Sequence, residues 1–269
     1  MSKKPLKRAQ LPEEKQWWLG LKPGELPEHV ILTLLMDIPP DYFRKELDEL
    51  VQLSGPLAKQ LNTPNEYLAY KGDFRGHQIG LLYHGSGSFS ISTALEELAR
   101  LGVKTVLRVG NSGGFQEQVR VGDIVVASGA IRAERMLLDY APLEYPAVAD
   151  RRLVECLIEA SREAGATCHE GLTLSVASFY AGSGFQTAAG VLDETVSDRV
   201  HLWQKAGALN VDAETSTVLV MSRLFGMRGG ALLGIGNHLI SGEGDYLTGQ
   251  SRLARTALRG LRLLAEEQV

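Results

Sequence analysis

Arg108 is the residue whose position in this sequence most strongly suggests chemistry. It stands near the end of VKTVLRV (103–109), a short apolar run rich in β-branched residues, which is typical of a strand buried on both faces. A guanidinium is costly to bury unless an anion meets it. The next residues, GNSGG (110–114), have backbone N–H groups that can approach an anion closely. The pattern predicts an oxyanion site, and the alternative is a structural arginine paired with an internal acid such as Glu96 or Glu97.

A second run, HGSGSFS (84–90), is a candidate backbone cradle for an anion. It follows the apolar run QIGLLYH (78–84) and precedes a predicted helix at 91–101, so its N–H groups and hydroxyls stand at a helix N-terminus. It lacks the third glycine of a dinucleotide fingerprint and the Gly-Lys-Ser/Thr of a Walker A loop. Alone, this run indicates no particular ligand.

Two acids, Asp212 and Glu214, stand at the start of a predicted apolar helix at 213–225. A carboxylate fits a helix start, where the helix dipole favours negative charge. The alternative is that one of these acids accepts two hydroxyl protons from a sugar. His238, in GNHLISGEGD (236–245), could donate a proton at neutral pH, or it could be a loop histidine without a chemical role.

Side chains for stacking are present, whereas motifs for metal binding are not. Phe179 and Tyr180, in SFYAGSGF (178–185), could stack on a flat ring, and the alternative is packing in the core. The sequence has no GxSxG, HExxH or paired-cysteine zinc motif. Its two cysteines, Cys156 and Cys168, cannot build a disulfide framework or a metal site by themselves.

The overall composition is that of an ordinary globular protein. The chain has 269 residues, of which 44% are hydrophobic and 22% charged, and its net charge is −4. This charge argues against nucleic acid or an anionic membrane surface as a partner. The first residues, MSKKPLKRAQLPEEK, lack the apolar segment of a signal peptide, and no run has the length of a membrane span. The sequence therefore predicts a cytoplasmic protein that holds any anion by local positive charge.

Strands alternate with helices along the chain after a polar segment, residues 1–16, which is predicted to be a mobile tail. Residues 17–269 form one predicted α/β domain, because no linker or repeat interrupts them. Three predicted strands end in polar, Gly-rich turns, at 84–90, 110–114 and 236–244, and ligands of such sheets bind beyond the carboxyl ends of strands. The predicted strands are 29–35, 67–71, 78–84, 103–109, 122–131, 171–178 and 230–236, and the predicted helices are 41–53, 91–101, 150–164, 192–206, 213–225 and 248–266.

Longer motifs resemble the nucleoside phosphorylase family and, within it, the uridine phosphorylases. The resemblance rests on GSGSFSISTALEELARLGVKTVLRVGNSGGF (85–115), LLDYAPLEYPAVAD (137–150) and NVDAETSTVL (210–219), and it spans nearly the whole chain after residue 17. It implies a single-domain phosphorylase/hydrolase-like α/β fold, in which a twisted central mixed sheet, partly closed as a barrel, is flanked by helices. The family consists of hexameric enzymes, so the resemblance also implies a homo-oligomer, dimer-based and possibly hexameric.

The resemblance implies a pentosyltransferase that carries out phosphorolysis: phosphate attacks the anomeric carbon of a nucleoside, and the free base and a pentose 1-phosphate result. Inorganic phosphate is then the co-substrate, with no other cofactor, no metal and no nucleic acid or membrane partner. The family pattern places Arg108 on phosphate, Glu214 on the ribose 2′- and 3′-hydroxyls and Phe179 on the base. The predicted catalytic residues are Arg108, Glu214 and His238, and the predicted substrate-binding residues are Gly87, Asn111, Ser112, Gly113, Phe179, Tyr180, Asp212, Ala213 and Trp18.

The sequence departs from the family pattern at the phosphate loop. The family has Pro-Gly-Asp-Pro with an arginine two residues later, and this chain has LLMDIPPDYF (34–43). Met36 stands for the glycine and Pro40 for the arginine. Arg44 is nearby and takes the arginine's place only if the loop shifts. At least one phosphate contact is therefore predicted to be missing.

The base side departs as well. Ser183 and Phe185 replace the Gln-x-Arg pair that reads uracil, and His238 replaces an arginine. Trp18 replaces a histidine that reaches the 5′-hydroxyl in a neighbouring subunit. These changes predict an altered base specificity and make His238 a candidate to protonate the leaving base. Three hypotheses follow: a phosphorylase of altered base specificity, a hydrolase of the same superfamily in which water replaces phosphate, and a non-catalytic nucleoside-binding homologue.

Overall fold

The computed structural model describes residues 15–46, 66–188, 190 and 193–266. Lys15 and Gln16 are therefore the described part of the predicted tail, and Gln16 is buried. The second half of the predicted helix 41–53 lies outside the described ranges.

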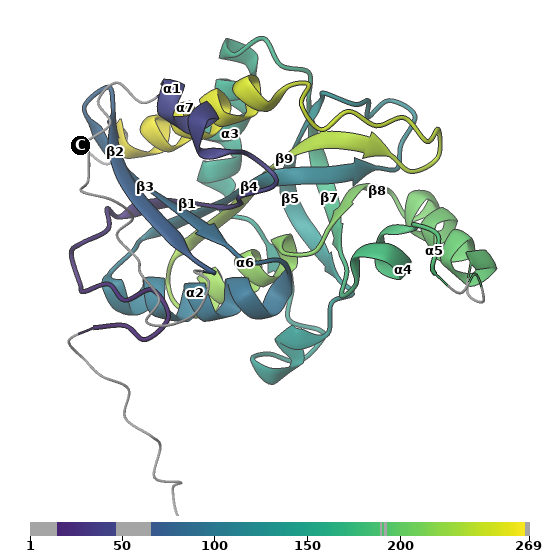
Figure 1. Cartoon of the computed structure of the whole chain (residues 1–269), viewed down its shortest axis with the longest axis horizontal. Coiled ribbons are helices and arrows are strands. Elements are labelled where there is room, and N and C mark those ends of the chain that lie inside the picture. The colour runs from purple at the N-terminus through teal and green to yellow at the C-terminus, as the bar shows by residue number, and fades with distance from the viewer. Residues whose placement is uncertain (1–14, 47–65, 189, 191–192, 267–269) are drawn as a thin grey trace, which may run out of the picture.

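A nine-stranded mixed sheet forms the centre of the protein (Figure 1). Its strands lie in the order β2-β3-β1-β4-β8-β7-β5-β6, and β9 pairs with both β4 and β5. The pairings β4–β8, β8–β7, β7–β5, β5–β9 and β9–β4 return to the first strand, so these strands close a barrel-like ring. This confirms the predicted fold class. The strands are β1 (His29–Leu34), β2 (Leu68–Phe74), β3 (His77–His84), β4 (Thr105–Gly114), β5 (Ile124–Arg132), β6 (Ala147–Val148), β7 (Cys168–Ser175), β8 (Ala208–Asp212) and β9 (Arg228–His238).

Helices cover both sides of the sheet. In Figure 1, α2 and α6 lie below it, α1, α3 and α7 lie above it, and α4 and α5 lie beside the ring on the right. α3 packs on α7 and α2 packs on α6, so each buries an apolar stripe. Among the described helices, none has both the length and the hydropathy that crossing a membrane requires. The helices are α1 (Pro40–Glu46), α2 (Gly87–Leu101), α3 (Arg151–Glu163), α4 (Phe179–Ser183), α5 (Asp193–Lys205), α6 (Thr215–Leu224) and α7 (Gln250–Glu266), with a 3₁₀ turn at Met136–Asp139.

Alternate residues of the ring strands pack in different apolar clusters. Val126 of β5 and Leu232 of β9 belong to the main core, which also contains the buried faces of α2, α3, α6 and α7. Their neighbours Val125 and Leu233 belong to a separate, smaller cluster. Successive side chains of a strand point to opposite faces, so both faces of these strands are buried.

The predicted turn at 110–114 is wrong, because β4 continues to Gly114, with one shift of its register against β9 between Ser112 and Gly113. This segment pairs with β9 along its whole length, and Gly113 and Gly114 also pair with β8. Glycines suit this part of the strand because neighbouring groups occupy the space that a larger side chain would need. A β-carbon on Gly110 would collide with the Arg108 guanidinium and the Asp37 carboxylate.

Other elements also differ from the sequence prediction. α2 begins at Gly87, four residues before the predicted helix start, and Gly87 has a left-handed backbone with φ of 84° that favours glycine. The strand β8 and the short helix α4 were not predicted, because five-residue segments are too short for their periodicity to stand out. β8 ends at Asp212 and α6 begins at Thr215, so only two residues, Ala213 and Glu214, form the connection.

Candidate active site

Arg108 is buried at the centre of an ion cluster. Its side chain is 1% exposed, and its Nη2 lies 2.9 Å from Asp37 Oδ2 and 3.1 Å from Glu214 Oε2. Its Nη1 donates to the carbonyl of Val109 at 2.5 Å. The guanidinium is thus paired with acids, as the structural alternative expected, but these acids come from the ends of other elements.

Neither of the acids that the sequence suggested as internal partners contacts Arg108. Glu97 accepts hydrogen bonds from the backbone N–H groups of Trp18 and Leu19, at 2.9 and 2.7 Å. Glu96 forms an exposed ion pair with Arg100 on the same helix, at 2.7 Å. That part of the structural alternative is therefore wrong.

The strand register brings the Arg108 cluster together. Arg108 pairs with Leu32 of β1, and Asp37 follows three residues after that strand ends at Leu34. Glu214 stands in the short connection between β8 and α6. The glycine at 110 leaves room for the guanidinium to lie over its own strand, two residues further on. The two acids thus lie just beyond the carboxyl ends of β1 and β8, where ligands of α/β sheets bind, and Arg108 reaches them from within β4.

Glu214 is held on both carboxylate oxygens and is only 3% exposed. Its Oε2 faces Arg108, and its Oε1 accepts a hydrogen bond from the backbone N–H of Gly87 at 2.8 Å. This N–H group belongs to the first residue of α2, which has a left-handed backbone. The carboxylate is therefore fixed in one orientation between a guanidinium and a helix N-terminus.

The cluster holds three acids against one permanent cation. Burial raises the pKa of Asp37 to about 6 although Arg108 opposes this shift. Burial and the neighbouring Glu214 also raise the pKa of Asp212 to about 6. Burial opposes ionisation of Glu214 as well, but Arg108 together with the other groups around the carboxylate, such as the N–H of Gly87, outweighs it, so the pKa of Glu214 lies below its ordinary value. Glu214 is thus the stable counter-ion of Arg108, whereas Asp37 is close to taking up a proton at neutral pH.

Asn111 links this cluster to α7. Its Nδ2 donates to the main-chain carbonyl of Asp37 at 3.1 Å, and its Oδ1 accepts from Gln250 Nε2 at 2.7 Å. Gln250 is 3% exposed and also donates to the carbonyl of Tyr246. Sequence analysis did not single out Gln250, and its only signal was its place at the start of the final amphipathic helix.

His84 and Asp37 are further members of the cluster that sequence reasoning missed. His84 is the last residue of β3 and is 4% exposed. Its Nδ1 lies 2.7 Å from the carbonyl of Gly85, which can only accept, so Nδ1 carries the ring proton. Burial and the Arg108 charge lower the pKa of His84 to about 4, so the ring is neutral at pH 7. Both residues lie in motifs that stand out in the sequence, HGSGSFS and LLMDIPPDYF, but the motifs predict no role for them.

Several predicted binding residues in or beside the cluster make their hydrogen bonds within the scaffold. Asp212 accepts hydrogen bonds from Ser175 Oγ at 2.9 Å and from Thr215 Oγ1 at 2.6 Å, and thereby anchors the start of α6. Ser112 donates to the carbonyl of Gly234 and accepts from Asn210 Nδ2, so it ties β4 to two neighbouring strands. The main-chain carbonyl of Ala213 accepts a hydrogen bond from Ser88 Oγ at 3.1 Å.

Both ring nitrogens of His238 are occupied by the backbone. Nδ1 accepts from the N–H of Ser241 at 3.1 Å, so the proton is on Nε2, which lies 3.1 Å from the carbonyl of Gln116. The side chain is buried, with 6% exposure. A leaving base could receive this proton only after the contact with Gln116 opens, so that role stays a prediction.

The predicted aromatic residues lie on the surface. Phe179 and Tyr180 are 62% and 64% exposed on α4, and Phe179 stacks on Phe185 with ring centroids 5.0 Å apart. The alternative that Phe179 and Tyr180 pack in the core is therefore wrong. Trp18 is 39% exposed, and its backbone N–H is the group bound to Glu97.

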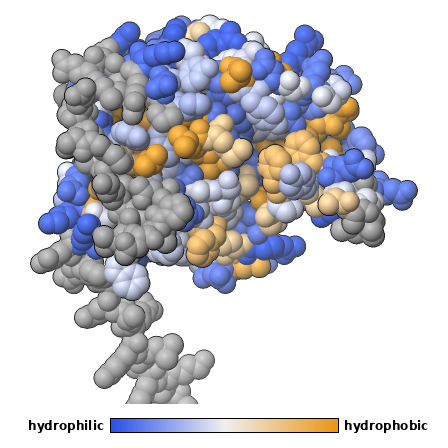
Figure 2. Space-filling model, in the orientation of Figure 1, coloured by the Kyte–Doolittle hydropathy of each residue, from blue (hydrophilic) through white to orange (hydrophobic). Residues whose placement is uncertain are grey.

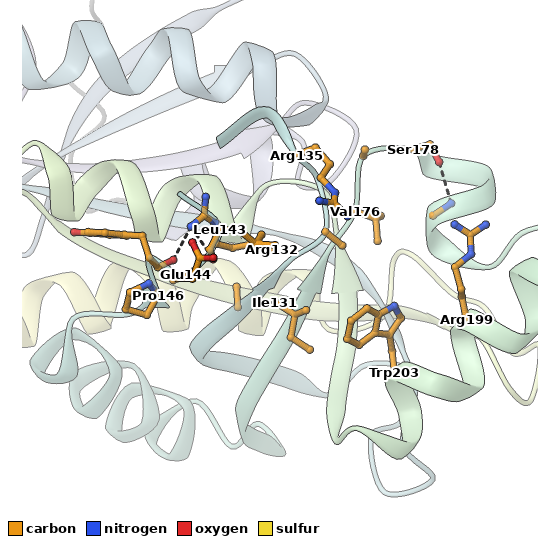
Figure 3. A pocket seen from close by; sticks show the side chains of 16 residues that line it. Ile131, Arg132, Arg135, Leu143, Glu144, Pro146, Val176, Ser178, Arg199 and Trp203 are labelled. Atoms are coloured by element: carbon orange, nitrogen blue, oxygen red, sulfur yellow. Dashed lines mark hydrogen bonds between the residues drawn. The ribbon is translucent and has the colours of Figure 1, made fainter. Parts of the chain in front are cut away.

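A cavity of about 680 Å³ opens beside the ring, between the ends of β5 and β7, residues 143–147 and α5 (Figure 3). Arg132 lies in its wall and donates to the carbonyls of Pro142 and Tyr145, both at 2.6 Å, which fixes the neighbouring loop. Trp203 forms another part of the lining. None of the predicted site residues lines this cavity, so it is separate from the Arg108 cluster.

Comparisons with known proteins agree with the fold and the motifs. Residues 40–265 match the sequence profile of the Phosphorylase superfamily. A uridine phosphorylase of Thermococcus kodakarensis is 30% identical over 96% of this chain and 90% of its own length. The uridine phosphorylase of Escherichia coli is 35% identical over 65% of this chain and 70% of its own length. A guanosine phosphorylase of Halorubrum lacusprofundi is 34% identical over 66% of this chain and 68% of its own length.

Solved structures extend the likeness to three dimensions. The crystal structure of uridine phosphorylase from Vibrio fischeri has a TM-score of 0.75, with 26% identity over 93% of this chain and 98% of that one. Sequence profile, relatives and structure all cover most of the sheet that carries Arg108 and Glu214. The chain therefore belongs to the phosphorylase superfamily, as a member of the nucleoside phosphorylase family that its motifs resemble.

Proposed function

We propose that this protein is a nucleoside phosphorylase that uses inorganic phosphate as its co-substrate and needs no other cofactor. A phosphate oxygen attacks the anomeric carbon of the sugar, the bond to the base nitrogen breaks, and its electron pair leaves with the base. The products are the free base and a pentose 1-phosphate. The observation that carries this proposal is the buried ion pair between Arg108 of β4 and Glu214, which follows β8, with its N–O distance of 3.1 Å.

Arg108 and Glu214 have distinct roles in this reaction. Arg108 holds the phosphate, since a planar, permanently charged guanidinium suits an oxyanion. Glu214 holds the ribose 2′- and 3′-hydroxyls and so fixes the sugar for attack. Positive charge develops on the sugar as the glycosidic bond breaks, and the adjacent phosphate stabilises it.

Phosphate must exchange with a carboxylate on the guanidinium, because Asp37 and Glu214 both face Arg108 Nη2. Asp37 is the group that gives way. Its pKa of about 6 means that it becomes a neutral acid at little cost, whereas the pKa of Glu214 is lowered and that carboxylate keeps its charge. This exchange explains how a site that is internally neutralised can still accept an anion.

The phosphate site is proposed to be less complete than the family pattern. Met36, in the place of the family glycine, is 76% exposed. Pro40, in the place of the family arginine, begins α1 and brings no charge. The side chain of Arg44 is outside the described part of the structure, so its replacement of the missing phosphate-binding arginine stays a prediction. A weaker phosphate affinity than the family norm is therefore part of the proposal.

The base specificity is proposed to be altered. Phe179 and Tyr180 supply flat, exposed rings for a base, while Ser183 is buried and brings no charge for reading uracil. Asn111, Ser112, Gly113, Gly87, Ala213 and Asp212 are proposed to line or support the sugar and phosphate positions. His238 remains the proposed proton donor to the base if its contact with Gln116 opens on substrate binding.

The protein is proposed to act as a cytoplasmic homo-oligomer, dimer-based and possibly hexameric. Figure 2 shows apolar surface in patches across the middle of one face. Large apolar side chains that are exposed in the single chain include Trp17, Met36 and Phe89. Such surface is typical of interfaces, and Trp18 is proposed to lie near a neighbouring subunit's site. Nucleic acid and membranes are not proposed as partners.

The deciding experiment is a cleavage assay on a panel of purine and pyrimidine nucleosides, with and without inorganic phosphate, in which base and pentose 1-phosphate are quantified. Cleavage that depends on phosphate and disappears in Arg108→Ala supports the proposal. Equal cleavage without phosphate means that water is the nucleophile and that the protein is a hydrolase. Absence of cleavage together with thermal stabilisation by a nucleoside means a non-catalytic binding homologue.

A further inference from the structure

Two buried polar atoms next to the Arg108–Glu214 pair have no hydrogen-bond partner among the described residues: Arg108 Nε and His84 Nε2. The two atoms have opposite hydrogen-bonding sense. The guanidinium N–H can only donate, and His84 Nε2 can only accept because Nδ1 holds the ring proton against Gly85. Buried polar atoms in native proteins are usually paired, so an unpaired donor and an unpaired acceptor in one site are available to a ligand.

His84 and Arg108 present their side chains to the same side of the sheet. Arg108 pairs with Leu32 of β1 and His84 pairs with Leu34 of the same strand. Leu32 and Leu34 are two residues apart and so share a face, and aligned residues of parallel neighbours share it too. His84 also interacts electrostatically with both Arg108 and Glu214. The imidazole therefore borders the position that phosphate takes on Arg108.

A neutral imidazole restricts what this position accepts. The low pKa of His84, about 4, keeps a lone pair on Nε2 at neutral pH. A lone pair repels an unprotonated anionic oxygen and attracts an O–H group. Hydrogenphosphate and dihydrogenphosphate both carry an O–H near neutral pH, whereas sulfate has the same tetrahedral shape and carries none.

We propose that His84 is a further substrate-binding and specificity residue, whose Nε2 accepts a hydrogen bond from the P–O–H group of a phosphate held by Arg108. The inference rests on the proposed function for the identity of its ligand. It predicts that the site prefers phosphate to sulfate, since only phosphate satisfies the acceptor. Arg108 Nε then donates to one of the unprotonated phosphate oxygens, so both unpaired atoms find partners.

The test is calorimetric binding of inorganic phosphate and of sulfate to the full chain and to two variants. In His84→Gln the side-chain amide reaches the position of Nε2 and can present its oxygen there. In His84→Asn the amide reaches only the position of Nδ1. We expect the wild type and His84→Gln to prefer phosphate, and His84→Asn to lose this preference by roughly tenfold to a hundredfold, as for a hydrogen bond to a charged group. The affinity for sulfate should not fall in His84→Asn.

Several results would overturn the inference. An equal loss of phosphate and sulfate binding in His84→Asn would make His84 a structural residue only. The same loss in His84→Gln as in His84→Asn would exclude the acceptor. A wild type that binds both anions equally, or neither, would also refute it, and this result does not depend on whether the variants fold.

The outcomes also separate this inference from the proposed function. Preference for phosphate in binding, without phosphate-dependent cleavage of any nucleoside, would remove the proposed function and keep the role of His84. Phosphate-dependent cleavage by a wild type that binds phosphate and sulfate equally would keep the function and remove the role of His84.

Discussion

The substitution Asp37→Asn tests the claim that a carboxylate of the protein itself competes with phosphate for Arg108. Asparagine has nearly the same shape as aspartate and carries no charge. Phosphate can bind beside an ionised Asp37, or Asp37 can first take up a proton. At about 4 Å and an effective dielectric constant of about 20, repulsion would cost about 4 kcal/mol per unit of phosphate charge. Protonation of a group with a pKa of about 6 costs only about 1.4 kcal/mol at pH 7, so protonation is the cheaper route.

The size of the effect on phosphate follows from this protonation cost. Asp37→Asn should lower the KM for phosphate about tenfold at pH 7 and roughly a hundredfold at pH 8, and the two proteins should converge below pH 6. Titration of phosphate itself affects both proteins equally and cancels in the ratio. The assay is initial-rate phosphorolysis at several phosphate concentrations between pH 5.5 and pH 8 (a range chosen for the test).

Asp37→Asn should also raise the free energy of unfolding at pH 7. The pKa of Asp37 is raised in the folded state from 3.8 to about 6, so its contribution favours folding below pH 4 and is lost as the pH rises through 6. The loss amounts to roughly 3 kcal/mol above pH 6. Asp37→Asn should therefore be more stable than the wild type at pH 7, by up to about that amount, and equal to it near pH 4. Urea unfolding at the two pH values measures this difference.

The control for Asp37→Asn is Asp41→Asn, which makes the same charge change at an exposed residue of α1. It should leave the phosphate KM and its pH dependence unchanged. The reasoning is refuted if the ratio of KM values is independent of pH. It is refuted equally if the free energy of unfolding of Asp37→Asn falls by the 3–5 kcal/mol typical of a broken buried ion pair. Asp37 would then position Arg108 instead of competing with phosphate for it.

Three other substitutions test the rest of the site. Arg108→Ala should abolish phosphate-dependent turnover and lower the free energy of unfolding by about 3–5 kcal/mol, because it leaves two buried carboxylates without their cation; wild-type stability in urea would contradict this. Glu214→Gln should raise the KM of a ribonucleoside about tenfold or more and that of the 2′-deoxynucleoside less, and equal effects on both would argue against hydroxyl binding. Gly110→Ala should destabilise the fold by about 1–3 kcal/mol and weaken phosphate binding, since its methyl group meets the guanidinium; a variant with wild-type melting temperature and KM would show that Arg108 has another position available.

The pattern of single segments was enough to single out Arg108 and Glu214 as candidates. Arg108 stood out because a charged residue interrupts an apolar strand, and Glu214 because it precedes an apolar helix inside a family motif. The predicted βαβ order and the fold class were confirmed for the same reason: the period of apolar residues and the positions of glycines are local properties of the chain. In β5 and β9 this period appears as successive side chains that pack in two different apolar clusters.

Other features of the site could not be predicted, because they depend on residues that are far apart in sequence. Asp37 is 71 residues from Arg108, and Gln250 is 139 residues from Asn111. Only the pairing of β1 with β4, and the packing of α7 against β4, brings these groups into contact. The extension of β4 through its glycines was missed because glycine looks like a turn former until the side chains that fill its place are known.

The sequence by itself determined which residues carry charge, where strands and helices follow one another, and which family motifs are present. Only the tertiary structure determined which of those groups are ionised and which of them form ion pairs. Burial raises the pKa of Asp37, lowers that of His84 and gives Arg108 two acidic partners, because removal from water and proximity to other charges arise only once the sheet has closed.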